Sequence, residues 1–176
     1  LQGTSKFTEW IALSGLDVSY LGDSGITMTL LLPSDEAVDK ALEEFPELVD
    51  RLSAMDKALA AALVLPHVVQ GIYPLVQFED GVELTTANNQ SLTLSTTGGD
   101  IAIASTTVST TLDLSSANNG AFNGLAHLVD TVLVPPVEDW PEPLVDEDDD
   151  DDTEAPPSDT GDDEPGEDAA DTEVTE

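Results

Sequence analysis

Two histidines, His67 and His127, are the residues best suited to acid–base or metal chemistry in this chain, which has no cysteine. Two histidines far apart in the sequence, without a thiolate, are weak support for a zinc site. The chain also lacks the Gly-x-Ser-x-Gly turn that presents a nucleophile in many hydrolases, and it has no glycine-rich phosphate-binding loop. The sequence therefore predicts a non-enzymatic protein without a cofactor; a hydrolase that uses His67 or His127 is the alternative.

The surroundings of both histidines favour structural roles. His67 ends an alanine-rich helical stretch, where a ring that is hydrogen-bonded to a nearby backbone group is expected. His127 lies in an apolar stretch with Leu125 and Val129 on its face, and such a histidine usually belongs to the core. Asp130 is expected to accept structural hydrogen bonds rather than to act as a base.

Acidic residues dominate the charge, which is −33 at pH 7. Residues 1–136 contain 17 acidic and all 4 basic residues, whereas residues 137–176 contain the other 20 acidic residues and no lysine or arginine. A surface of this sign repels nucleic acid and anionic lipid, so neither is an expected partner. No apolar run of 18 residues is present, so direct membrane insertion is not expected either.

Residues 137–176 are predicted to form a disordered, polyacidic, proline-containing tail or linker, because they have too few apolar side chains to offset the chain entropy lost on folding. Five consecutive aspartates occur there: Asp148, Asp149, Asp150, Asp151 and Asp152. They lack the glycine and glutamate of an EF-hand loop, so weak, diffuse calcium binding is expected; a solvated spacer is the alternative. Trp140 is a candidate to fold back onto the preceding domain.

Helices are expected in the first half of residues 1–136. The apolar face of residues 7–16 predicts a helix, which Gly15 is expected to end. Residues 26–32 are predicted to form an apolar strand with both faces covered. Ser34 is the predicted N-cap of a helix that extends to about residue 44. Pro46 begins a second short helix, and Asp56 caps a third, over residues 57–65.

From residue 82 onward the apolar period changes to two, which is typical of strands. Strands are predicted at residues 82–84, 92–94, 101–103 and 108–114. A last strand, residues 125–134, is expected to follow an Asn123-Gly124 turn and to end at Pro135-Pro136, because proline lacks the backbone donor. Helices followed by a β-meander that this strand closes predict an α+β domain over residues 1–136.

Three stretches resemble, in the right order, motifs of the fasciclin family, an extracellular adhesion module. TLLLPSDEAV (29–38), with Pro33 and Asp35, is similar to the first motif; HVVQGIY (67–73) is similar to the middle one; NGLAHLVDTVLVPP (123–136), with His127 and Asp130, is similar to the last. The resemblance implies a compact wedge of two β-sheets with several helices packed on one side. It also implies a further helix before Phe7, so a trimmed N-terminus is expected.

The resemblance further implies a candidate adhesion surface at His67, Asp113 and Leu114. Relatives carry a Tyr-His pair at the first position and an Asp-Ile pair at the second, whereas this chain has Pro66 before His67 and Leu114 after Asp113. Extra residues within 116–122 also separate Asp113 from the last motif. An exposed aspartate beside an aliphatic residue could ligate a receptor-bound cation; an ordinary strand end is the alternative.

Asn89 begins an Asn-Gln-Ser sequence in a predicted turn, so it is a candidate glycosylation site. Together these features predict an extracellular or cell-surface module for cell adhesion or matrix binding. It would contact extracellular proteins or glycans, integrin-like receptors among them. The alternative is a secreted polyanion that binds calcium or mineral and uses the domain as an anchor.

Overall fold

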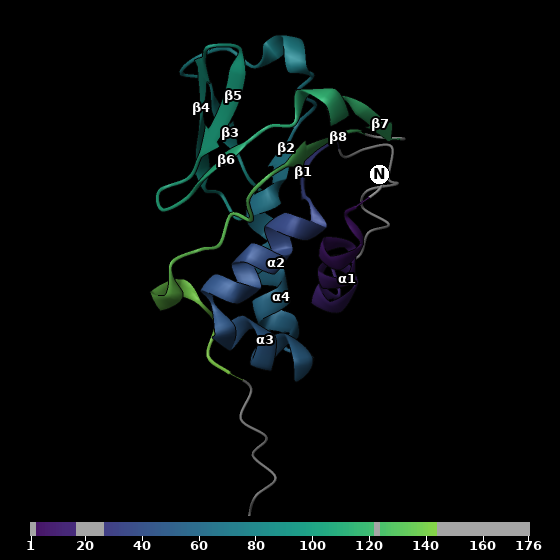
Figure 1. Cartoon of the computed structure of the whole chain (residues 1–176), viewed down its shortest axis with the longest axis vertical. Coiled ribbons are helices and arrows are strands. Elements are labelled where there is room, and N and C mark those ends of the chain that lie inside the picture. The colour runs from purple at the N-terminus through teal and green to yellow at the C-terminus, as the bar shows by residue number, and fades with distance from the viewer. Residues whose placement is uncertain (1–2, 17–26, 122–123, 144–176) are drawn as a thin grey trace, which may run out of the picture. The chain divides into compact units, whose positions relative to one another are not determined.

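The computed structural model describes residues 3–16, 27–121 and 124–143 (Figure 1). Helices come first along the chain: α1 (Ser5–Ser14), α2 (Asp35–Glu44), α3 (Pro46–Ser53) and α4 (Lys57–Val64). Strand β1 (Met28–Pro33) lies between α1 and α2 in the sequence. The aspartate run and the remainder of the tail from residue 144 lie outside the described residues.

The strands of the described residues form two four-stranded sheets. The first has the order β2-β1-β8-β7, with β2 at Val68–Gln70, β7 at Asn119–Ala121 and β8 at Gly124–Val129. The second has the order β3-β4-β5-β6, with β3 at Glu83–Thr85, β4 at Ser91–Thr97, β5 at Asp100–Ala104 and β6 at Ser109–Thr111. Neighbouring strands are antiparallel except β1 and β8, which run parallel.

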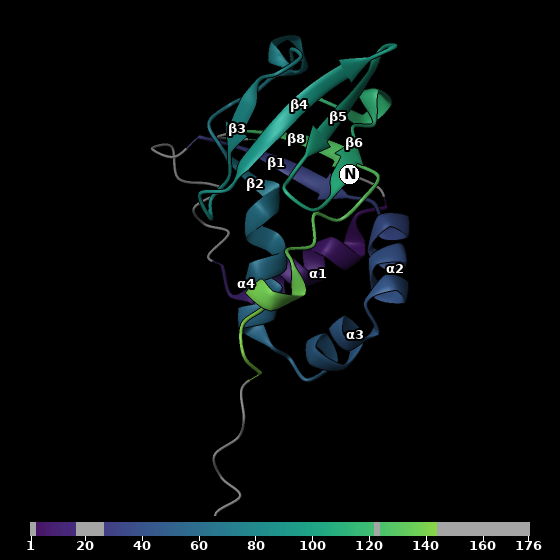
Figure 2. The same ribbon diagram turned by 90° about the vertical axis from the view of Figure 1, so that its left-hand side faces the viewer.

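The sheet that contains β1 lies between the helices and the second sheet (Figure 2). Leu32 packs among residues of all four helices, whereas Leu31 packs with side chains of the second sheet, such as Leu92 and Ile103. This alternation confirms that both faces of β1 are covered. The predicted α+β wedge, with its helices packed on one side, is therefore the observed fold.

The predicted helix boundaries have the expected physical causes. The Ser34 hydroxyl accepts a hydrogen bond from the Ala37 N–H at 3.1 Å, and Asp56 accepts one from the Leu59 N–H at 2.9 Å. Pro46 occupies the start of α3, and Gly15 ends α1 with a φ of 64°. Helix α4 ends at Val64 and passes into a 3₁₀ turn, Leu65–His67, that contains Pro66.

The prediction for the last strand is wrong in length and in partner. Strand β8 ends at Val129 rather than Val134. Within its sheet it pairs in parallel with β1 and antiparallel with β7, and it meets the end of the meander through the isolated bridge between Val129 and Leu112. Beyond Val129 the backbone finds other partners: the Leu133 N–H donates to the His67 ring at 2.9 Å. The strand therefore ends before Pro135-Pro136 is reached, because the chain leaves the ladder to meet side chains of the core.

The predicted strand at residues 108–114 is also too long. Strand β6 covers Ser109–Thr111, and Leu112 forms an isolated bridge with Val129. Leu114–Ser116 is a 3₁₀ turn that the Asp113 side chain caps. A side-chain cap competes with the ladder for the backbone donors and ends the strand early.

Side-chain contacts with the domain continue beyond residue 136, where the predicted tail begins. Trp140 packs edge-on against Phe45 with ring centroids 6.0 Å apart, and its indole N–H donates to the Pro135 carbonyl at 3.0 Å. Residues 137–143 therefore continue the folded part of the chain, as the position of Trp140 indicated.

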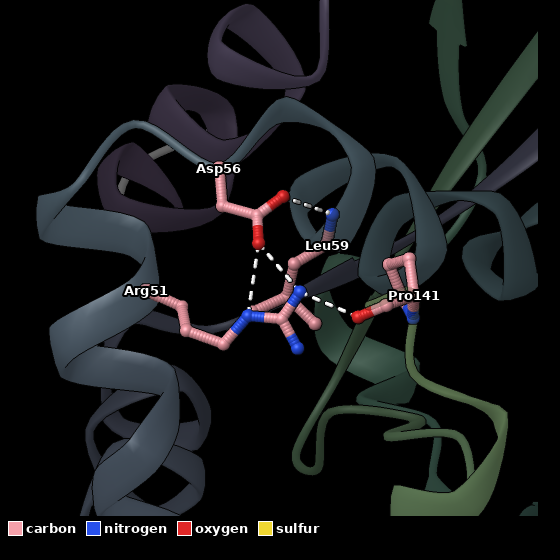
Figure 3. A network of polar contacts seen from close by, with 4 residues as sticks. All are labelled: Arg51, Asp56, Leu59 and Pro141. Atoms are coloured by element: carbon pink, nitrogen blue, oxygen red, sulfur yellow. Dashed lines mark hydrogen bonds and ion pairs between the residues drawn. The ribbon is translucent and has the colours of Figure 1, made fainter. Parts of the chain in front are cut away.

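A partly buried ion pair attaches this segment to the helices (Figure 3). Arg51 donates to one carboxylate oxygen of Asp56 from Nε at 2.9 Å and from Nη2 at 2.5 Å, and Nη2 also donates to the Pro141 carbonyl at 2.6 Å. Burial acts to raise the pKa of Asp56, but the hydrogen bond from the Leu59 N–H and the contact with Arg51 outweigh it and hold the pKa below its ordinary value. One arginine thus links α3, the start of α4 and residue 141.

Gly124→Ala tests the parallel pairing of β1 and β8. A Cβ atom at Gly124 would overlap the Met28 carbonyl oxygen, which is backbone and cannot turn aside. We expect the unfolding free energy to fall by about 2 kcal/mol or more, measured by urea denaturation. Gly120→Ala on β7 is the matched control, because its Cβ would meet no atom within 4 Å. Equal stability of the two variants would contradict the close approach of Gly124 to the Met28 carbonyl oxygen.

Arg51→Met tests the link to residue 141. It leaves the Asp56 carboxylate without its cation and the Pro141 carbonyl without this donor, so we expect a loss of about 1–3 kcal/mol of unfolding free energy. Lys57→Met removes an exposed lysine for which the described residues supply no ion pair, and it should change stability little. A cost for Arg51→Met no larger than that for Lys57→Met would show that the link is weak.

Candidate adhesion surface

His127 on β8 is buried and holds two loops together. Its Nε2–H donates to the Tyr73 carbonyl at 3.0 Å, and its Nδ1 accepts from the Asn118 N–H at 3.3 Å. The ring also lies against Phe78, with ring centroids 5.1 Å apart. Burial lowers the pKa of His127, so the ring is neutral near pH 7 and can donate from one nitrogen while it accepts at the other.

Further bonds fix the same two loops. The side-chain oxygen of Asn118 accepts from the Leu75 N–H at 2.9 Å, which joins one loop to the other directly. The buried hydroxyl of Thr29 on β1 donates to the Gly71 carbonyl and accepts from the Tyr73 N–H, both at 2.9 Å. We call residues 71–78 and 113–119 the two-loop surface.

Exposed aliphatic side chains lie on the two-loop surface. Val76 is 85% exposed, Ile72 46% and Leu114 42%. These residues project from loops whose backbones are tied to buried His127 and Thr29, so their positions are set by the core. Such a surface can bind a partner with a small loss of conformational entropy.

Asp113 and Leu114 belong to this surface, and their part in adhesion stays a prediction. The Asp113 carboxylate accepts from the Ser115 hydroxyl at 2.6 Å and from the Ser115 N–H at 2.9 Å. These hydrogen bonds, that of the hydroxyl first, lower the pKa of Asp113. Asp113 is therefore ionised at neutral pH beside an exposed aliphatic side chain.

The predicted contribution of the His67 side chain to an exposed surface is wrong, because the ring is fully buried. Its Nδ1–H donates to the Leu63 carbonyl at 2.9 Å, its Nε2 accepts from the Leu133 N–H, and Phe7 meets the ring edge-on with centroids 4.8 Å apart. Burial lowers the pKa of His67 to about 4. The ring is a neutral connector between α4 and the segment after β8, as the structural interpretation expected.

The other predicted motif residues have structural contacts. Asp130 accepts from the Thr111 N–H at 2.8 Å and from the hydroxyls of Thr110 and Thr131 at 3.1 and 3.0 Å, so it is a hydrogen-bond acceptor as expected. Asp35 accepts from the Lys6 N–H at 2.9 Å, and Pro33 ends β1.

The structure does not bring the two histidines together: each ring has its own backbone partners. Within the described residues, no group of three or more His, Asp or Glu side chains is arranged to hold a metal ion. Asn89 lies in an exposed turn with a φ of 60°, and its glycosylation stays a prediction.

Sequence reasoning missed Thr29 and Asn118, which position the two-loop surface. Thr29 gave no signal, because a threonine within an apolar strand is ordinary. Asn118 has a φ of 56° and stands before Asn119 and Gly120, a grouping typical of tight turns that could have identified the loop.

The neutral state of His67 predicts a pH dependence of stability. The unfolded ring titrates near 6.5 and the folded ring near 4, so the unfolded state takes up the proton first as the pH falls. The stabilisation by the neutral ring is therefore complete above about pH 6.5 and is lost towards pH 4. The difference between the two pKa values corresponds to about 3 kcal/mol of unfolding free energy. Urea denaturation at pH 7 and pH 4.5, in high salt to screen carboxylate repulsion, measures the loss.

The control for this prediction is His67→Gln, which supplies one donor and one acceptor at the same place but does not titrate. We expect the difference in unfolding free energy between the two pH values to be smaller in this variant. An equal difference in both proteins would mean that His67 does not carry the pH dependence.

Comparisons with known proteins agree with this geometry. The model of the fasciclin domain family matches residues 2–135. A solved FAS1 domain pair from the insect cell adhesion molecule fasciclin I is similar in structure, with a TM-score of 0.65 at 16% sequence identity, over 76% of this chain and 47% of that one. The chain thus spans about half the length of that structure. No curated protein matches the sequence.

Among the helices of the described residues, none combines the length and the apolar composition that a membrane-spanning segment requires. The family model matches most of the chain, and the fold agrees with that of the solved domain pair. The chain belongs to the fasciclin domain family, whose members are generally non-enzymatic adhesion modules of the extracellular space or cell surface.

Proposed function

We propose that this chain is an adhesion or matrix-binding module that contacts extracellular proteins or glycans through the two-loop surface. The supporting observation is the pair of loops that buried His127 ties together, because they present Ile72, Val76 and Leu114 to solvent. Apolar side chains on a fixed backbone favour association with another surface.

Asp113 adds a charged group to this contact. Its carboxylate stands next to Leu114 and is ionised at neutral pH. A carboxylate beside an aliphatic side chain suits a receptor that holds a divalent cation, such as an integrin-like receptor. The aliphatic side chain would then fill an adjoining apolar depression.

A second candidate function rests on composition. Residues 137–176 carry 20 acidic residues and no lysine or arginine, which favours calcium or mineral binding by a secreted polyanion. In that case the folded part would serve as an anchor. Truncation after residue 143 separates the two functions: the adhesion proposal requires binding to cells or matrix to persist, whereas the second requires it to vanish.

A bead-retention assay tests the adhesion proposal. Beads coated with the full chain are applied to cells and to immobilised matrix proteins and glycans, and the retained beads are counted. We expect the double variant Val76→Ser/Leu114→Ser to lower bead retention by about tenfold, because two apolar contacts of about 0.7 kcal/mol each are lost. The double variant Val49→Ser/Met55→Ser is the matched control, since these side chains are also exposed, 44% and 71%, but belong to the helical side. An equal effect of both double variants, or retention no higher than on uncoated beads, would contradict the proposal.

A further inference from the structure

A cavity of about 310 Å³ lies between α2 and the segments that follow β5 and β8. Its walls include Ala41, Val108 and Val132, and its charged groups are Lys40, Glu44 and Asp130. We call it the Asp130 pocket. Its size is at the small end for ligand sites, about 300–1,000 Å³, so it suits one side chain or a small molecule.

The carboxylate of Asp130 is held in a fixed orientation. Its Oδ1 accepts three hydrogen bonds, from the Thr111 N–H, the Thr110 hydroxyl and the Thr131 hydroxyl. Its Oδ2 makes no hydrogen bond with any of the described residues. One oxygen is thus saturated and anchors the group, while the other is available to a donor from outside.

The charges of the pocket select the sign of its ligand. Two carboxylates, Glu44 and Asp130, outnumber one cation, Lys40, and none of the three forms an ion pair within the described residues. The rest of the domain is also strongly acidic, with 17 acidic against 4 basic residues in residues 1–136. This field attracts cations and repels anions.

The walls complete the selection. The apolar lining accommodates an aliphatic stem, and the two lining carboxylates suit the planar, multiply donating head of arginine. We propose that the Asp130 pocket binds an arginine side chain of a partner protein. This contact is separate from the two-loop surface, on different elements, and does not depend on the function proposed for that surface.

The test is an NMR titration of the ¹⁵N-labelled full chain with a short blocked peptide that contains a single arginine among neutral residues. We expect the Thr111 and Thr131 amides, beside the Asp130 carboxylate, to shift. The same peptide with citrulline, a neutral isostere of arginine, should leave them unchanged. Equal shifts with both peptides would overturn the proposal, since the charge would then be irrelevant.

Charge variants separate the pocket from diffuse attraction to an acidic chain. Glu44→Gln should weaken binding of the arginine peptide by about two- to fivefold, and Lys40→Met should strengthen it by a similar factor. Glu47→Gln and Lys57→Met are the matched controls, because these exposed residues of α3 and α4 do not line the pocket. Asp130 is left intact, because it holds the loop at Thr110 and Thr111.

Two outcomes would contradict the arginine assignment. Weaker binding in Lys40→Met would identify Lys40 as a ligand group and point to an anionic or hydroxylated ligand. Equal effects of Glu44→Gln and Glu47→Gln would show that the peptide responds only to overall charge.

Discussion

The parallel pairing of β1 with β8 is the constraint on which the rest of this structure depends. It joins residues that lie far apart in the sequence, from Met28 opposite Gly124 to Pro33 opposite Val129. Both faces of β1 are buried, one against the helices and one against the second sheet. Loss of this ladder would separate the two cores and release His127 from its loop partners.

Two neutral histidines extend that constraint to the irregular parts of the chain. His67 satisfies the backbone of Leu63 and Leu133, and His127 satisfies that of Tyr73 and Asn118. A neutral imidazole can donate and accept at once, which two different backbone groups require here. The chain therefore uses buried rings where a sheet ladder is absent.

Local sequence signals predicted much of the fold, whereas the features that depend on pairing between distant segments could not be predicted. The caps at Ser34 and Asp56 set helix starts through bonds to residues three positions away, so they could be inferred from the sequence. The parallel pairing of β8 with β1 could not be inferred, because nothing in the residues of β8 distinguishes a parallel neighbour from an antiparallel one. For the site, Asp113 and Leu114 could be named from the resemblance to the family, but the role of Asn118 depends on a loop that is distant in sequence.

The ring tautomers of the two histidines test the central claim most directly. The hydrogen bonds require a proton on Nδ1 of His67 and on Nε2 of His127, so ¹⁵N NMR of the full chain near pH 7 should find two different, fixed tautomers. A mixture of tautomers at His127, or titration of its ring near pH 6.5, would mean that the two loops are not held as described.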